Sequence, residues 1–147
     1  MAQSRESLLA ALDRLVLAAV GVTTVALAES GEGHDLTLSQ WRALVVITSA
    51  DGLRASEVAQ RIGMSRPSMS RLIRRLERRG VIVADQDPHD GRATILRATR
   101  TGAAMRVATM NRRRELMAEA LDARPGTLPP DLAGGLDAIA GALERYG

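Results

Sequence analysis

Residues 55–80 read ASEVAQRIGMSRPSMSRLIRRLERRG, and this stretch decides the fold. Its pattern predicts a short helix over residues 55–62 and a second helix that runs to about Arg79, joined by a three-residue turn. Gly63 suits the left-handed backbone conformation just past a helix end. Ser65 suits the N-cap of the second helix and Pro67 its first turn. Two helices joined in this way are typical of a helix-turn-helix.

The second helix has two contrasting faces. One face is apolar and predicted to pack inward, and the opposite face is rich in Arg and Ser. An exposed helix of this kind fits the major groove of B-DNA, where Arg can bind guanine through two hydrogen bonds. Early residues of such a helix reach base edges, and later ones lie nearer the backbone. We therefore expect Ser68, Ser70 and Arg71 to read bases, Arg74 to reach base or phosphate, and Arg75, Arg78 and Arg79 to contact phosphates. The alternative is a solvated, Arg-rich surface helix.

A β-hairpin is predicted after this helix, with strands over residues 81–83 and 93–98 and a loop over residues 86–91. Asp90-Gly91-Arg92 is expected at its tip. A hairpin beside a helix-turn-helix forms a wing, from which Arg92 could enter the neighbouring minor groove. Asp90 is expected to orient Arg92 through a charge-assisted hydrogen bond. The alternative is that both are turn residues only. The full set expected to bind DNA is Ser65, Arg66, Ser68, Ser70, Arg71, Arg74, Arg75, Arg78 and Arg92, with Asp90 supporting the wing.

Helices are predicted on both sides of this lobe. The chain begins with an amphipathic helix over residues 5–28 and a polar loop over residues 31–35, and a further helix opens at residues 36–39. Thr99 is expected to cap a long helix to about Ala123, and Pro129-Pro130 precedes the last helix. Gly134-Gly135 is expected to permit close packing there, and Arg112-Arg113-Arg114 to form a solvated face. The apolar seams of the first and last helices exceed what a small lobe needs, which favours a dimer. The alternative is that the two helices pack on each other within one chain.

Composition narrows the function classes. The formal net charge is +3, and all 20 basic residues are Arg. Residues 54–100 hold 11 Arg against 5 acidic residues, a basic centre typical of a polyanion-binding protein. No Cys is present, and His34 and His89 lie far apart, so neither a metal nor a cofactor is expected. Phosphate-binding Gly-rich loops and nucleophile elbows are missing, so no enzyme is expected. The apolar run Leu15–Ala28 looks too short to span a bilayer, and we expect a cytoplasmic protein.

Three segments together resemble the MarR (multiple antibiotic resistance) regulators. Residues 55–63 with 65–71 and 76–80 look like that family's helix-turn-helix, and residues 85–92 look like its wing. The resemblance implies a two-fold dimer formed through the first and last helices, a pseudo-palindromic operator, and release of DNA when a small anion binds. Arg71 matches the family's recognition-helix arginine and Arg92 its wing-tip arginine. Arg54 stands where the family often has a Thr or Ser helix cap.

We therefore predict a mainly α fold with a small β-hairpin wing, a winged helix-turn-helix with dimerisation helices at both ends. Residues 1–35 would form the N-terminal dimerisation helix, residues 36–100 the DNA-binding lobe and residues 101–147 the C-terminal dimerisation helices. The predicted function is sequence-specific binding of double-stranded DNA at an inverted repeat, as a repressor relieved by a small-molecule effector. The rival hypothesis is a winged-helix module that docks a protein partner and binds no specific DNA.

Overall fold

The helix-turn-helix is formed as the sequence predicts. The structure, a computed structural model, describes residues 2–30 and 36–146. Helix α3 (Ala55–Arg61) is followed by α4 (Arg66–Arg78). Gly63 between them has a φ of +67°, the conformation expected of a glycine that ends a helix. Ser65 occupies the N-cap position of α4, but its side chain makes no capping hydrogen bond, so that part of the prediction is wrong.

The wing is longer than predicted and belongs to a three-stranded antiparallel sheet. Strand β2 (Ile82–Asp87) pairs with β3 (Asp90–Ala98), so most of the predicted loop over residues 86–91 is strand. The tip of the hairpin is Pro88-His89, and Asp90-Gly91-Arg92 opens β3 instead of forming the tip. A third strand, β1 (Leu53–Arg54), pairs with the inner end of β3 in the order β1-β3-β2. Two residues carry too little pattern to be recognised as a strand from sequence.

The core lies inside the lobe formed by α2 (Leu38–Ile47), α3, α4 and the sheet. It is aliphatic apart from Trp41, and its fully buried members include Leu44, Ile47, Val58, Leu76 and Leu96. The inner face predicted for α4 is confirmed, although Ile73 is only partly buried. Because this apolar face of α4 is packed inward, the opposite, basic face points to solvent.

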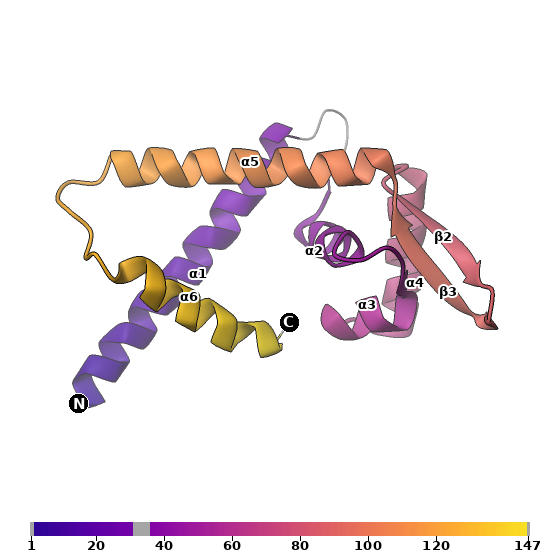
Figure 1. The fold of residues 1–147 in the computed structure, drawn as a ribbon, viewed down its shortest axis with the longest axis horizontal. Coiled ribbons are helices and arrows are strands. Elements are labelled where there is room, and N and C mark those ends of the chain that lie inside the picture. Colours follow the sequence, from indigo (N-terminus) through magenta and orange to yellow (C-terminus); the bar gives the residue numbers. More distant parts are fainter. Residues whose placement is uncertain (1, 31–35, 147) are drawn as a thin grey trace.

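Helix α5 (Arg100–Asp122) connects the lobe to the rest of the molecule (Figure 1). Its N-cap is Thr99, as predicted, and the Thr99 hydroxyl accepts a hydrogen bond from the backbone N–H of Gly102 at 3.0 Å. The same hydroxyl donates to the Gly80 carbonyl at 2.6 Å. A Cβ atom at Gly102 would stand 2.0 Å from the Val81 carbonyl oxygen, so only glycine allows α5 to approach the lobe this closely.

Helix α1 (Ala2–Ser30) crosses α5 and packs on it through its C-terminal third (Figure 1). Thr23, Ala26 and Leu27 are buried there, whereas most of α1 is exposed. Over Ser4–Ser30, α1 is long and apolar enough to cross a membrane by length and composition, because the helix extends well beyond the run Leu15–Ala28 considered in the sequence. The predicted loop over residues 31–35 lies outside the described residues.

The last helix, α6 (Leu132–Leu143), continues into a 3-10 turn η1 (Glu144–Tyr146) and has no buried residue. An apolar groove lies between α6 and the N-terminal half of α1, lined by residues that include Leu8, Leu15, Leu132 and Leu136. Cβ atoms at Gly134 and Gly135 would meet nothing within 4 Å in the described part of the chain. The close packing expected at these two glycines is therefore not made within this chain.

Candidate nucleic-acid interface

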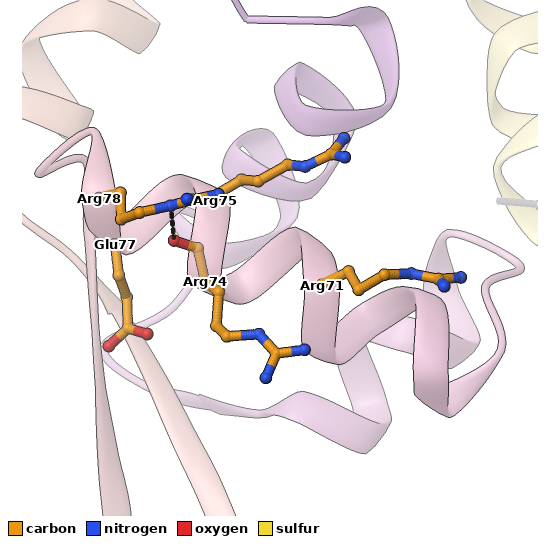
Figure 2. A pocket seen from close by; sticks show the side chains of 5 residues that line it. All are labelled: Arg71, Arg74, Arg75, Glu77 and Arg78. Atoms are coloured by element: carbon orange, nitrogen blue, oxygen red, sulfur yellow. Dashed lines mark hydrogen bonds between the residues drawn. The ribbon is translucent and has the colours of Figure 1, made fainter.

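The exposed face of α4 is a continuous row of guanidinium groups. Arg71, Arg74 and Arg75 extend away from the helix, and Arg78 folds back along it (Figure 2). Its Nε donates to the Arg74 carbonyl oxygen at 3.3 Å. Among the nine residues predicted to bind DNA, Ser68 is half-buried and the other eight are exposed. The structure thus brings eight of these residues onto α4 and its N-cap, whereas Arg92 lies on β3.

Within residues 2–30 and 36–146, no carboxylate forms an ion pair with an arginine of α4. Among the described residues, the ion pairs involve Arg54, Arg97 and Arg112, and none involves an arginine of α4. Glu77 is the one carboxylate on this helix, and it is exposed in the last turn. An unpaired row of five arginines over 13 residues attracts a polyanion, and no ion pair among the described residues has to be broken for the polyanion to bind.

A chain of hydroxyl contacts precedes these arginines at the start of α4. The Ser65 hydroxyl donates to Ser68 Oγ at 3.1 Å, and Arg71 Nη2 donates to the same oxygen at 3.3 Å. Since a guanidinium has five N–H donors, this contact holds the Arg71 side chain while leaving most of its donors free for a ligand.

Two further hydroxyl residues lie beside this row and were missed in the sequence. Thr37 and Ser39, at the N-terminus of α2, line a surface hollow together with Ser68, Arg71 and Arg75. The backbone N–H groups at a helix N-terminus favour anions. The signal was available in the Thr37 capping box, but only the tertiary structure brings this helix end next to α4.

Arg79 was expected to contact phosphate, but it is engaged inside the lobe. Its Nη1 donates to Gln40 Oε1 at 3.0 Å, and Gln40 is almost fully buried. The same oxygen accepts from the Thr37 backbone N–H at 3.0 Å, which completes the capping box of α2. Arg79 therefore ties the end of α4 to the start of α2.

Arg92 is exposed near the outer end of the wing, as predicted. Asp90 supports it differently from the prediction, because Asp90 Oδ1 accepts from the backbone N–H of Arg92 at 3.1 Å and not from its guanidinium. Across the hairpin, Gln86 Nε2 donates to the Gly91 carbonyl at 2.7 Å. These two contacts shape the backbone that carries Arg92.

The outer end of β2 in the wing is joined to the helix-turn-helix by an ion pair that the sequence did not suggest. Arg54 donates to Asp87 Oδ2 from both Nε (3.1 Å) and Nη2 (2.8 Å), and the backbone N–H of His89 donates to Asp87 Oδ1 at 2.9 Å. Asp87 is buried, and these bonds from His89 and Arg54 hold the pKa of its carboxyl below the ordinary value of 3.8.

Arg54 is the N-cap residue of α3, where its backbone N–H donates to Glu57 Oε2 at 2.9 Å. Helix α3 therefore begins after Arg54, although Arg54 stands where the family often has a Thr or Ser cap. A single residue both begins α3 and fixes the wing to it.

Away from this face, Arg112 departs from its prediction. It is not simply solvated, because it pairs with Glu29 of α1 at 2.6 Å and with Glu115 and Glu119 of its own helix. These three carboxylates raise the pKa of its guanidinium further. Arg112 thus joins α1 to α5. In the described part of the chain, no group of three or more His, Cys, Asp or Glu side chains could hold a metal ion.

Comparison with known proteins identifies the lobe. The sequence pattern of the MarR family matches residues 34–93, which span α2 to the start of β3. Over these residues, the chain matches the MarR family. The expected winged helix-turn-helix and the resemblance stated from the sequence are thereby confirmed. MarR-family proteins are transcriptional regulators and not enzymes, as expected. A search of curated protein sequences gives no match.

Solved MarR-type structures share the fold over nearly the whole chain. A MarR-family transcriptional regulator from Rhodococcus sp. RHA1 superposes with a TM-score of 0.74 at 19% identity, covering 97% of this chain and 96% of its own. The repressor CouR of Rhodococcus jostii RHA1, bound to a 23-mer DNA duplex, superposes with a TM-score of 0.70 at 24% identity, covering 92% of this chain and 89% of its own. PcaV from Streptomyces coelicolor, in complex with its natural ligand, superposes with a TM-score of 0.64 at 24% identity, covering 92% of this chain and 91% of its own.

Proposed function

We propose that this MarR-family protein is a sequence-specific repressor that binds an inverted-repeat site in double-stranded DNA as a homodimer. The observation that carries the proposal is the exposed row of arginines on α4, which no carboxylate of the described chain neutralises. The expected DNA-binding residues are Ser65, Arg66, Ser68, Ser70, Arg71, Arg74, Arg75, Arg78 and Arg92, with Asp90 supporting the wing.

Dimer formation is part of this proposal. Large apolar side chains of α1 and α6 are exposed in a single chain, among them Leu8, Leu15, Leu17, Leu136 and Leu143. A second copy that covers these faces would remove an aggregation hazard. It would also present two α4 helices about one DNA turn apart, which an inverted repeat requires. In this arrangement residues 36–100 act as the DNA-binding lobe, residues 1–35 and 101–147 form the dimer, and the protein works in the cytoplasm.

Repression and its relief by a small molecule are supported by the neighbours. CouR is a repressor bound to DNA, and PcaV holds its natural ligand. Repression requires only that a bound protein occupy the promoter, so it needs no surface for the polymerase.

The test is binding of the purified protein to duplex DNA fragments from the region around its own gene, measured by gel shift over a range of salt concentrations. We expect salt-sensitive binding to one fragment over competitors. Arg71→Ala should weaken this specific binding by about 5- to 150-fold and change nonspecific binding less. Equal losses on specific and random DNA would make Arg71 a phosphate contact. Absence of any sequence preference would support the rival protein-docking module.

A further inference from the structure

We infer that the major-groove half-site of this protein is centred on guanine, with neighbouring guanines read by Arg71 and Arg74. This inference rests on the proposed function and names the class of DNA sequence that the site takes.

The first reason is the set of side chains that α4 can offer to bases. Adenine is read by Asn or Gln, cytosine by a carboxylate, and the thymine methyl group by an apolar contact, whereas guanine O6 and N7 accept two hydrogen bonds from Arg. The exposed residues of α4 and its N-cap include no Asn and no Gln. Of its apolar residues, Met69, Leu72 and Leu76 are buried, Ile73 is partly buried, and Pro67 is exposed in the first turn. Serine hydroxyls donate or accept and favour no base. The remaining side chains on this helix that select a base by hydrogen bonds are arginines.

The single carboxylate does not alter this conclusion. Glu77 lies in the last turn of α4, next to Arg78. In a helix-turn-helix the early residues reach base edges, and the later ones lie by the backbone. A carboxylate at that end is therefore placed near phosphates and not near a cytosine amino group.

The second reason is how the arginines are held. Arg78 is turned back onto the Arg74 carbonyl, and Arg79 is engaged with buried Gln40. By contrast, Arg71 rests on the Ser68 hydroxyl and Arg74 extends from the helix (Figure 2). Of the other arginines, Arg66 lies in the first turn of α4 and Arg75 lies beside the N-terminus of α2. We therefore take Arg71 and Arg74, in the middle of the helix, as the two that present a guanidinium fork to a base.

The third reason is spacing. Residues three apart on a helix are separated by about 4.5 Å along its axis and lie on neighbouring parts of its surface. Adjacent base pairs are stacked about 3.4 Å apart. Arg71 and Arg74 can therefore reach neighbouring base pairs, so we expect two adjacent or nearly adjacent guanines in each half-site.

The experiment starts from a random-sequence duplex pool, from which the full-length protein selects its preferred site. Each guanine of the selected duplex is then replaced in turn by 7-deazaguanine, which lacks the N7 acceptor and keeps base pairing. Dissociation constants are measured for the natural protein, for Arg71→Ala and Arg74→Ala, and for a control, Arg124→Ala. Arg124 is an exposed arginine beyond the far end of α5, where its side chain donates to the nearby Gly126 carbonyl.

We expect guanine at one or two neighbouring positions of each selected half-site. Deazaguanine at these positions should weaken binding by about 5- to 150-fold for the natural protein and for Arg124→Ala. The same replacement should have little further effect at one of the positions with Arg71→Ala, and at the other with Arg74→Ala. Since both arginines are exposed, the variants should fold, and their circular dichroism spectra check this.

Two results would overturn the inference while leaving the proposed function intact. One is a selected site whose major-groove half-sites contain only A·T pairs. The other is a guanine-containing site at which deazaguanine has the same effect on the natural protein and on both α4 variants. A pool that yields no preferred sequence at all would instead remove the proposed function itself.

Discussion

At the scale of single residues, the Arg54–Asp87 pair connects two parts of the winged helix-turn-helix lobe that are 33 positions apart in the chain. Arg54 is at the start of α3, which packs on α4, and Asp87 is at the outer end of β2. The backbone N–H of His89 occupies the other Asp87 oxygen. The pair therefore sets the angle between the wing and the helix-turn-helix.

Replacing Arg54 by Ala should weaken specific DNA binding several-fold, because the wing would no longer hold Arg92 in register with α4. If Arg54 acts through the wing, this loss should disappear in a chain that already carries Arg92→Ala. Gel-shift titration of the two single variants and the double variant measures this coupling. Arg97→Ala is a matched control, since Arg97 pairs with the exposed Asp85 on the same sheet. Strictly additive losses would show that Arg54 does not act through Arg92.

Asp87 should make the stability of the protein depend on acid. Its folded-state pKa is lowered by the bonds from His89 and Arg54, so its stabilising contribution is present above about pH 4 and is lost as the pH falls through the folded-state pKa. The free energy of unfolding, measured with urea from pH 7 to pH 3, should be higher for the natural protein than for Asp87→Asn at pH 7, and this difference should shrink as the pH falls. Asp85→Asn, on the exposed part of the same strand, serves as the control. A difference in the free energy of unfolding between the natural protein and Asp87→Asn that stays constant across this pH range would contradict the stabilising role given to the ionised Asp87.

At the scale of secondary-structure elements, the joint between the sheet and α5 determines how the lobe is attached. The Thr99 hydroxyl caps α5 and bonds to Gly80, the Thr99 backbone N–H donates to the Val81 carbonyl at 3.1 Å, and Gly102 lies directly against that carbonyl. A change here moves a whole helix relative to the lobe, because backbone contacts leave no flexible side chain to adjust.

Gly102→Ala should destabilise the fold by about 1–3 kcal/mol, because the clash of the new methyl group with Val81 outweighs the better helix propensity of alanine. Chemical denaturation followed by circular dichroism measures the change. Thr101→Ala, at the exposed neighbouring position, also raises the helix propensity, by at most about 0.7 kcal/mol, and makes no clash, so it should not destabilise the fold. Equal stability of Gly102→Ala and the natural protein would mean that α5 can move away from the sheet at little cost.

At the scale of the whole molecule, the elongated arrangement in Figure 1 leaves α6 and most of α1 without a covering layer. One lobe carries the core, and long helices extend away from it. The same α1 that has the length and composition of a membrane-crossing helix packs its buried C-terminal third on α5. A second copy that covers the remaining apolar side chains of α1 would account for both the apolar composition of this helix and its exposure in a single chain.

Leu15→Glu should shift the protein from dimer to monomer, because it places a charge in the apolar groove between α1 and α6. Multi-angle light scattering should give twice the 15.7 kDa chain mass for the natural protein and a lower mass for the variant at equal concentration. Binding to an inverted repeat should fall in parallel. Arg14→Glu places the same new side chain on a neighbouring exposed position and should remain dimeric. A natural protein with the mass of a single chain would contradict the dimer.

Local patterns were enough to predict the helix-turn-helix, the exposed basic face of α4 and the limits of α5. Helix periodicity, capping residues and left-handed glycines depend on residues that are close in sequence, so they can be recognised from the sequence alone. The face of α4 was predicted correctly because the apolar residues Met69, Leu72 and Leu76 must be buried, and this fixes the direction of the arginines between them.

Only the tertiary structure decided the features that join distant segments. Strand β1 forms because Leu53 pairs with Leu96 of β3. Arg54 binds Asp87 rather than phosphate or solvent. Arg79 points inward and donates to Gln40. An exposed arginine and an internally bonded one look the same in sequence. The residue that bonds such an arginine lies tens of positions away in the chain, and it reaches the arginine only when burial of the core brings the elements together.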